Sequence, residues 1–293
     1  MGRKRVLHLY LNDAQQREIA AGTAGILTRV AEAVTAAGWA VELQPVQRPV
    51  GGDGYHLVFN QAVEVPFCLC LRRVYLNPFW RIEASNDRWD WEVARLRFDG
   101  TRVANHASAF QSRWRDIVFK GIDICQNGYV FMPLQGKLEI RRHFQAMSPL
   151  EMIAATLQAD PARRIIATLH PNEVYSAAEI AALRGFGPRF AVSDLPSKTL
   201  LAGCDYVVTQ NSGMGLLGWF ADKPAVLFGR IDFHHMAGSV PDSGVAGAFA
   251  GAGGKGPYAG YLHWFFKQQA ITWWDASAGA RIQARFREHG WPM

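Results

Sequence analysis

Between residues 128 and 228, short apolar segments of strand length alternate with segments of helical periodicity. Two helical segments open on strong start signals: Ser148 and Ser176 are each followed three residues later by a glutamate, and Pro149 takes the first helical position. Strands separated by helices pair in parallel, because the chain crosses over between them. The alternation therefore predicts a doubly wound parallel α/β sheet. We expect strands at 129–134, 164–169, 190–192, 206–209 and 224–228, and helices at 148–158, from 176, at 196–202 and at 214–221.

The first part of the chain starts in the same way. One long helical pattern runs from Ala14 to Ala37 and is capped by Asn12 or Asp13. A length of 293 residues suits about two domains of roughly 100 to 200 residues. We therefore expect an N-terminal α/β domain over 1–127, a second domain over 128–262, and closing helices over 263–293. The expected N-terminal strands are 6–11, 41–46, 55–59 and 67–74.

Two stretches show no clean period. Residues 75–119 are dense in Trp, Arg and Asn, and we expect their tryptophans to serve the core or a domain interface, with stacking on a sugar ring as the alternative. Residues 237–260 are mostly Gly, Ala, Ser and Pro, which predicts a mobile loop that is either a lid or a linker. The tryptophans concerned are Trp80, Trp89, Trp91 and Trp114.

Charge and cysteine usage limit the classes of function. The chain has 31 Lys and Arg against 25 Asp and Glu, a net +6 that favours an anionic nucleotide-sugar or membrane surface, without the long basic block of a nucleic-acid partner. Cys68 and Cys70 lie on the same face of an expected strand, and buried free thiols are favoured over a metal or redox site. This usage indicates a reducing compartment. Lacking an apolar run of spanning length or a signal-peptide core, the sequence predicts a cytoplasmic protein.

Polar residues follow two of the expected strands, at what we expect to be neighbouring strand ends. His170, in the segment 169–172, can donate to a phosphate oxygen or act as an acid, because histidine side chains exchange protons near neutral pH. Asn211, Ser212 and the Gly213 backbone offer donors at a helix start, which suit an anion. Carboxyl ends of strands bind ligands in open α/β sheets, so we expect a phosphate-bearing ligand here. The alternatives are a structural histidine and a plain helix cap.

Two further interpretations of this region are weaker. Gly213, Gly215 and Gly218 have the spacing of a dinucleotide fingerprint, with Asp232 nineteen residues after Gly213, so an NAD-dependent oxidoreductase is an alternative. That fingerprint belongs in the first strand-helix unit, whereas this one falls late in the chain. His170 could also join a metal set, but the spacing of its partners matches no ligand pattern, so no metal is expected. Those partners are Asp232, His234 and His235, expected instead as polar loop residues near the ligand site.

The series of motifs in the second half resembles the capsule polysaccharide biosynthesis family over roughly residues 128–235. The residues that carry the resemblance are 129–135, 138–143, His170-Pro171, and Asn211-Ser212 with Gly215. That family includes bacterial transferases of 3-deoxy-manno-octulosonic acid (Kdo), which use a CMP-activated sugar. They have a GT-B fold, in which two Rossmann-like domains face each other across a cleft.

The resemblance implies a glycosyltransferase of surface polysaccharide synthesis that moves a sugar from a nucleotide donor, CMP-linked and Kdo-like, to a saccharide or lipid-linked acceptor. The second domain would hold the donor and need no cofactor, and the helices over 263–293 would pack back across the domain interface. His170 would contact the CMP phosphate, and Gln135 would lie at the cleft edge. Peripheral association with the membrane would fit a lipid-linked acceptor. The donor-binding set is Gln135, His170, Asn172, Asn211, Ser212 and Gly213.

A catalytic base would come from the N-terminal, acceptor-side domain. The candidates are Asp13, Asp53 and Glu83, and Asp13 is favoured because it follows the first strand. The sequence also departs from the family, since Thr168 stands where a lysine commonly precedes the His-Pro pair. The run 216–218, Leu-Leu-Gly, replaces an acidic residue usual after the Asn-Ser pair. A nucleotide-binding or assembly protein that keeps the fold without turnover is therefore a further alternative.

Overall fold

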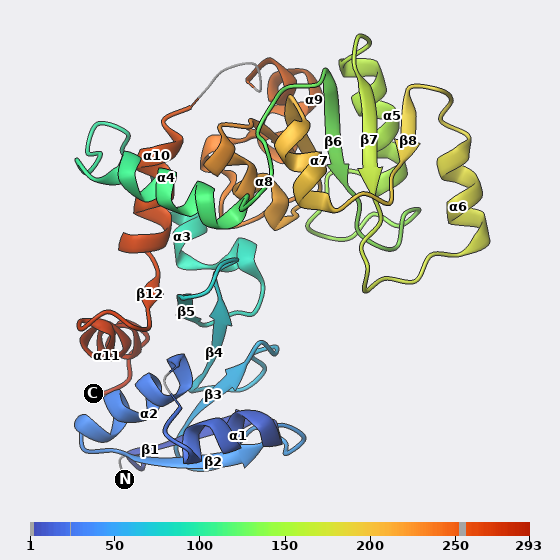
Figure 1. The fold of residues 1–293 in the computed structure, drawn as a ribbon. Helices are drawn as coiled ribbons and strands as arrows, with labels where there is room; N and C mark the ends of the chain where they lie inside the picture. The colour runs from blue at the N-terminus through green and yellow to red at the C-terminus, as the bar shows by residue number, and fades with distance from the viewer. Residues whose placement is uncertain (1–2, 24, 252–255) are drawn as a thin grey trace. The chain divides into compact units, whose positions relative to one another are not determined.

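The computed structural model describes residues 3–23, 25–251 and 256–293, which form two compact units. The first unit comprises Met1–Arg95 and Phe265–Met293, and the second comprises Leu96–Trp264. Each contains a six-stranded sheet (Figure 1). Residues 96–127, which the sequence assigned to the N-terminal domain, thus cluster with the second unit, and the C-terminal segment returns to the first.

The first sheet has the order β12-β5-β4-β3-β1-β2. Its four strands β1 to β4 pair in parallel, and β5 and β12 join one edge in antiparallel pairing. The four parallel strands confirm the expected N-terminal strands, while β5 and β12 were not anticipated because their surroundings show no alternation. The strands are β1 (Val6–Leu11), β2 (Ala40–Pro45), β3 (Tyr55–Phe59), β4 (Cys68–Arg73), β5 (Phe79–Glu83) and β12 (Ile271–Thr272).

The single helix expected over 14–37 is wrong, because two helices occupy this segment. Asn12 caps the first of them, with its side chain accepting the backbone N–H of Gln15. That helix ends before Gly22, whose φ of +62° lies in the left-handed region that favours glycine. The apolar period continues across the break and concealed it. The helical segments of this unit are α1 (Asp13–Ala20), α2 (Ile26–Ala36), η1 (Arg88–Asp90), α3 (Glu92–Arg95) and α11 (Ala278–Glu288), and the π-helix η4 (Trp264–Gln268) spans the boundary.

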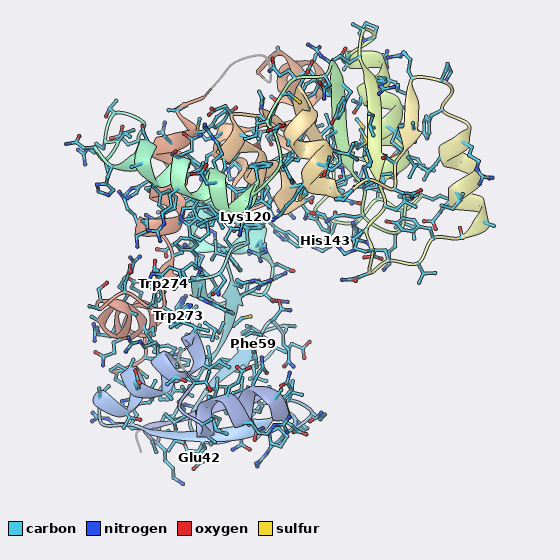
Figure 2. The ribbon with its side chains drawn as sticks, viewed as in Figure 1. Glu42, Phe59, Lys120, His143, Trp273 and Trp274 are labelled. Atoms are coloured by element: carbon cyan, nitrogen blue, oxygen red, sulfur yellow. The ribbon has the colours of Figure 1, made fainter. Side chains whose placement is uncertain are left out.

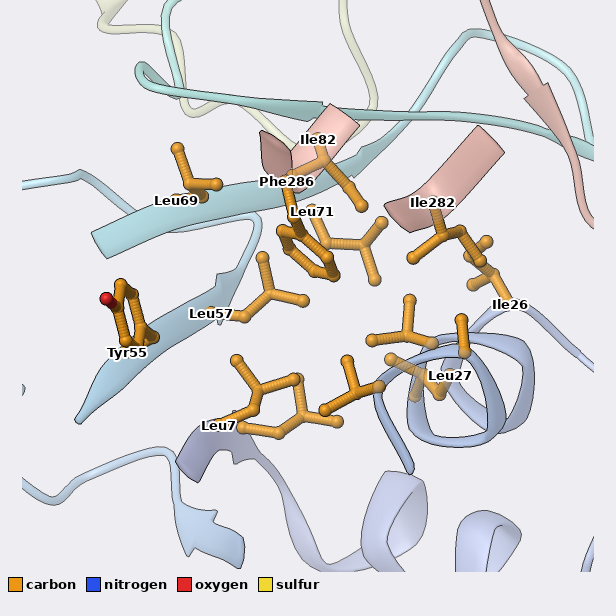
Figure 3. Packing of buried hydrophobic residues seen from close by; sticks show 14 of the residues in the cluster. Leu7, Ile26, Leu27, Tyr55, Leu57, Leu69, Leu71, Ile82, Ile282 and Phe286 are labelled. Atoms are coloured by element: carbon orange, nitrogen blue, oxygen red, sulfur yellow. The ribbon is translucent and has the colours of Figure 1, made fainter. Parts of the chain in front are cut away.

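Helices α2 and α11 cover one face of the first sheet (Figure 3). Leu57 and Leu71 from the strands meet Ile282 and Phe286 from α11 in one buried cluster. Trp291 stacks on Phe286 with ring centroids 4.6 Å apart, which holds the chain end against this core. The C-terminal helix is therefore an integral part of the first unit.

On the opposite face of this sheet, the loop residues Val50, Val63 and Val65 pack against a second buried cluster. Cys68 and Cys70 are buried there beside Tyr10 and Val58, and both are free thiols, as the sequence predicted. Burial raises the pKa of Cys68 to about 12. These thiols are packing residues rather than a reactive pair.

The second sheet has the order β11-β10-β9-β6-β7-β8, and every pairing is parallel. The first strand is central, the next two lie on one side and the last three on the other, which is the doubly wound dinucleotide-fold order. This confirms the predicted α/β class and every strand expected between residues 128 and 228. The strands are β6 (Tyr129–Pro133), β7 (Arg164–Thr168), β8 (Phe190–Val192), β9 (Tyr206–Thr209), β10 (Ala225–Leu227) and β11 (Gly238–Ser239).

Helices cover both faces of this second sheet. Both predicted serine caps are present as reciprocal capping boxes, Ser148 with Glu151 and Ser176 with Glu179. Apolar residues of α5, α6 and α9 pack on one face, while α7 and α8 contact β6 and β9. The helical segments are α4 (Ala107–Val118), α5 (Pro149–Ala159), α6 (Ala177–Arg184), α7 (Ser197–Gly203), α8 (Gly213–Gly218), η2 (Trp219–Ala221), η3 (His234–Met236), α9 (Val240–Gly251) and α10 (Tyr258–His263).

The mobile loop expected over 237–260 is wrong for most of its length. Strand β11, helix α9 and the start of α10 occupy it, with residues 252–255 lying outside the described part. Val240 and Ala248 bury themselves in the core below, although Gly244 breaks the helix with a φ of +65°. Small residues hid this helix, because Ala and Gly give little hydrophobic contrast.

The tryptophans mostly serve the two cores, as expected. Trp91 is fully buried in the first unit and donates from Nε1 to the Ser85 carbonyl at 3.0 Å, and Trp114 is buried in the second. Trp80 and Trp89 are half-buried. Along the described ranges, no helix is long and apolar enough to cross a membrane.

Candidate functional site

The carboxyl ends of the parallel strands in the second sheet all meet at one edge. Gln135 follows β6, His170 follows β7 and Asn211 follows β9. The sequence suggested that the two polar segments lie at neighbouring strand ends. In the structure β6 lies between β7 and β9, so the Gln135 loop separates the two segments. The switch point of the sheet falls between β6 and β9, where the chain reverses its direction of winding. Ligands of open α/β sheets bind outside this point.

His170 is exposed and held by its own loop. Its backbone N–H donates to Tyr175 Oη at 2.9 Å, and the Asn172 backbone N–H donates to His170 Nδ1 at 3.2 Å. A nitrogen that accepts a hydrogen bond carries no hydrogen in the neutral ring, so the proton is on Nε2. His170 therefore presents a donor Nε2–H to an incoming oxygen. Asn172 contributes through its backbone.

Ser212 acts as the cap of α8. Its Oγ accepts the Met214 backbone N–H at 3.3 Å, and its own N–H donates to Thr209 Oγ1 at 3.4 Å. The structure thus contains the plain cap that was the alternative for this segment, while the Ser212 O–H is still a donor. The Gly213–Gly218 spacing follows β9, the fourth strand of this sheet, whereas the dinucleotide fingerprint follows the first.

Two buried glutamines lie behind these loops, and sequence reasoning missed both. Gln210 is 1% exposed and donates from Nε2 to the Met147 carbonyl at 3.0 Å; Gln145 is 5% exposed and accepts the Arg142 N–H at 2.8 Å. Within the described ranges, Gln210 Oε1 and Gln145 Nε2 have no hydrogen-bond partner. An unsatisfied buried polar atom costs about 1–3 kcal/mol, so each is suited to a ligand group. The position of Gln210 directly after an apolar strand was the available signal.

Arg142 brings positive charge to the same edge. Its Nη2 lies 3.4 Å from Gln135 Oε1, and its guanidinium lies 4.9 Å from the Phe144 ring centroid. Its buried Nε has no partner among the described residues, and burial lowers the pKa of the guanidinium. Gly229 lets the chain after β10 approach closely, because a Cβ there would lie 3.1 Å from the Gln210 carbonyl and 3.2 Å from Phe144. The 135–147 loop therefore adds a cation and amides to the predicted set.

The family departures also have structural counterparts. Thr168 is buried at the end of β7, with Oγ1 3.2 Å from Ser197 Oγ. Leu216, in the run that replaces the usual acidic residue, is fully buried in α8. Both positions serve packing in this chain.

The histidine pair after β10 makes contacts within the fold. His234 Nδ1 lies 2.9 Å from the Ile231 carbonyl, and His235 Nδ1 lies 3.0 Å from Tyr261 Oη. Asp232 is fully buried. No group of three or more His, Cys, Asp or Glu side chains in the described part of the chain is placed to hold a metal ion. These contacts give His234 and His235 a structural role, while their expected position near a ligand stays a prediction.

The three candidate bases belong to the first unit and lie in different settings. Asp13 is exposed and opens α1 just beyond the carboxyl end of β1. Asp53 precedes β3, at the opposite edge, and accepts the Lys4 N–H at 3.3 Å. Glu83 is buried and paired with Arg81 and Arg285. Among the three, Asp13 alone occupies the edge at which ligands bind.

Comparison with known proteins identifies a shared fold. No protein-family model and no curated protein sequence matches this chain. The solved structure of KpsC from Thermosulfurimonas dismutans, a beta Kdo 2,7 transferase, is 13% identical, with 84% of this chain and 89% of that chain covered and a TM-score of 0.51. The beta Kdo 2,4 transferase KpsC of the same organism is 14% identical, with 83% of this chain and 89% of that chain covered and a TM-score of 0.47. The UDP-GlcNAc 2-epimerase of Methanocaldococcus jannaschii is 9% identical, with 97% of this chain and 100% of that chain covered and a TM-score of 0.35.

The first of these likenesses bears on the fold predicted from the sequence. This chain has an α/β fold with two Rossmann-like units, and it shares that fold with the beta Kdo 2,7 transferase KpsC. The resemblance that the motifs of the second half suggested is thereby confirmed at the level of the fold.

Proposed function

We propose that this protein is a glycosyltransferase that moves a sugar from a nucleotide donor, CMP-linked and Kdo-like, to a saccharide or lipid-linked acceptor of a surface polysaccharide. The observation that carries the proposal is the group of donors at the switch point of the second sheet. His170 offers Nε2–H on one side of Gln135, and Ser212 offers its hydroxyl on the other. A shared fold with a Kdo transferase supports it.

In this proposal, the donor phosphate is the leaving group. As the bond between the anomeric carbon and the phosphate oxygen breaks, negative charge develops on the phosphate. His170 Nε2–H donates to that oxygen, and the Arg142 guanidinium offsets the charge nearby. The buried amides of Gln145 and Gln210 offer one donor and one acceptor to polar groups of the nucleotide. The acceptor oxygen forms the new bond to the anomeric carbon while Asp13 accepts the proton of its hydroxyl, and CMP leaves.

Nucleotide-dependent thermal stabilisation tests the donor site. Ligand at one hundred times its Kd stabilises by about 2.7 kcal/mol, so CMP should raise the Tm measurably. His170→Ala and Ser212→Ala should abolish the rise, measured against each variant's own unliganded Tm. Arg164→Gln is the matched control, because Arg164 is exposed at the amino end of the strand that His170 follows. The absence of a shift with CMP, UDP and other nucleotides would refute the proposal.

A second candidate is a nucleotide-binding protein of this fold without turnover. The buried Thr168 and Leu216 favour it, since they stand where the family has charged groups. It predicts the same CMP shift, with neither donor hydrolysis nor transfer to any acceptor. An assay of CMP release from CMP-Kdo separates the two candidates.

A further inference from the structure

Three arginines and three aromatic rings line a cavity of about 510 Å³ in the first unit. The cavity lies at the carboxyl ends of β3 and β4, where Phe59 (labelled in Figure 2) is the last residue of β3. Its described lining contains no carboxylate. The lining residues are Phe59, Asn60, Arg72, Arg73, Tyr75, Trp80 and Arg88.

The position of the cavity matches the ligand-binding edge of this sheet. β1, β3 and β4 are parallel, so their carboxyl ends share one edge. Asp13 follows β1 at that edge, and β1 is the direct neighbour of β3. The cavity and the favoured catalytic base thus lie at the same edge of one sheet.

Arg73 is the exposed cation of the cavity. Its side chain makes no hydrogen bond or ion pair with any described residue, and in the sheet register it lies opposite Trp80. Arg72 is oriented by Asn86, whose Oδ1 lies 3.2 Å from its Nη1. Guanidinium groups in this setting bind carboxylate or phosphate through paired N–H donors.

The aromatic rings give the cavity the flat surfaces on which a sugar ring stacks. Phe59 and Trp80 lie with ring centroids 5.7 Å apart, and both also line a second cavity of about 280 Å³. That second cavity adds Trp273, the amides of Gln15 and Asn77, and the carboxylate of Glu18. Aromatic faces with amide side chains at their rims suit the apolar faces and hydroxyls of a saccharide. Two cavities that share a wall can hold two successive sugar units.

The backbone around the larger cavity is strained. Asn60 and Tyr75, which follow β3 and β4, have φ values of 54° and 53°, in the left-handed region that asparagine adopts more readily than tyrosine. Such conformations cost on the order of 1–3 kcal/mol each and cluster at ligand sites. Both strained residues line the cavity.

We infer that the larger cavity binds an anionic sugar. Arg73 takes its carboxylate or phosphate, and the rings of Phe59, Tyr75 and Trp80 take its apolar face. Its use as the acceptor subsite rests on the proposed function, whereas the binding itself does not. A transferase with this cavity extends a polymer whose terminal sugar is negatively charged.

Binding of simple sugars to the full chain tests the inference. The probes are glucuronic acid, glucose 6-phosphate, glucose and inorganic phosphate, followed by tryptophan fluorescence and saturation-transfer NMR. Both anionic sugars should bind at least tenfold more tightly than glucose, and glucose 6-phosphate more tightly than inorganic phosphate. Equal binding of glucose and glucuronic acid, or of phosphate and sugar phosphate, would overturn it.

Matched variants locate the binding site. Arg73→Gln should reduce the affinity for anionic sugars to that for glucose, and Tyr75→Leu should weaken binding of every sugar. Arg5→Gln is the control, because Arg5 is an exposed arginine at the amino edge of the same sheet. Anionic sugars that bind Arg73→Gln as tightly as the wild type would also overturn the inference.

The rise in Tm with CMP, measured on the same samples, distinguishes failure of the sugar cavity from failure of the transferase proposal. A CMP shift without binding of anionic sugars leaves the donor site standing and refutes the sugar cavity. Arg73-dependent sugar binding without any nucleotide shift supports the cavity and refutes the transferase proposal.

Discussion

Glu83 provides the sharpest test of whether a candidate base is catalytic or structural. Its carboxylate lies 2.7 Å from Arg81 Nε and 3.5 Å from Arg285 Nη2, and it accepts the Glu92 backbone N–H at 3.2 Å. The side chains of Glu83 and Arg81 are 4% and 3% exposed. Burial alone would lower the pKa of Arg285, but Glu83 and Glu92 raise it. The carboxylate of Glu83 therefore joins β5, α3 and α11.

Replacing Glu83 by Gln removes the negative charge and keeps the shape. Breaking a buried ion pair by removing one partner costs about 3–5 kcal/mol, because the remaining charge stays buried. The glutamine oxygen still accepts the Glu92 N–H, so we expect the lower end, about 3 kcal/mol. Domains are stable by about 5–15 kcal/mol, so this is a large fraction of the stability of the first unit.

Urea unfolding followed by tryptophan fluorescence measures the loss. Glu288→Gln is the control, because Glu288 pairs with the same Arg285 but its side chain is 55% exposed, and exposed pairs contribute less than about 1 kcal/mol. The reasoning fails if the free energy of unfolding of Glu83→Gln lies within about 0.5 kcal/mol of that of the wild type while the variant loses transfer activity. That result would make Glu83 the base.

Two further predictions concern local structure. Ser148→Ala should lower the free energy of unfolding, measured in urea, by about 1 kcal/mol, and by more than Ser176→Ala. Ser148 is buried, so water cannot replace its hydrogen bond with the Glu151 N–H, whereas Ser176 is exposed. Equal losses for the two variants would contradict this prediction. Iodoacetamide at pH 8 should modify only Cys125 in the native chain and all four thiols after denaturation. Burial raises the pKa of Cys68 and Cys204 to about 12, so little of either thiol is present as the reactive thiolate. Mass spectrometry that finds Cys204 modified in the native chain would refute this prediction.

The sequence predicted those elements whose signals are local. Ser148 and Ser176 are each followed three residues later by a glutamate, which predicts a helix start, and both capping boxes form as predicted. Where the signal is tertiary, prediction failed. The break at Gly22 between α1 and α2 leaves the apolar period intact, and α9 is held by burial of small residues. Strand order is tertiary too, and it places β6 between the two polar segments.

The candidate site was predictable to the same extent. His170 and Ser212 were found because they follow recognisable strands, although their hydrogen bonds with Asn172 and Met214 were not foreseeable. Gln145 lies in an irregular loop, and its burial depends on contacts with distant segments such as Gly229. A buried amide of this kind has no sequence signature, because glutamine is usually exposed.

The missing lysine at position 168 can now be weighed against the structure. Thr168 is buried beside Ser197, so a lysine there would need its ammonium desolvated or the contact with α7 rearranged. Arg142 instead brings a guanidinium to the same edge of the sheet from the loop after β6, close to Gln135. In the proposed donor site, a phosphate would therefore meet its cation from the loop after β6 rather than from the end of β7. On the proposed function, Arg142→Gln should therefore reduce the CMP-dependent rise in Tm more than any change at Thr168, and an equal loss at Thr168 would contradict a donor-binding role of the 135–147 loop.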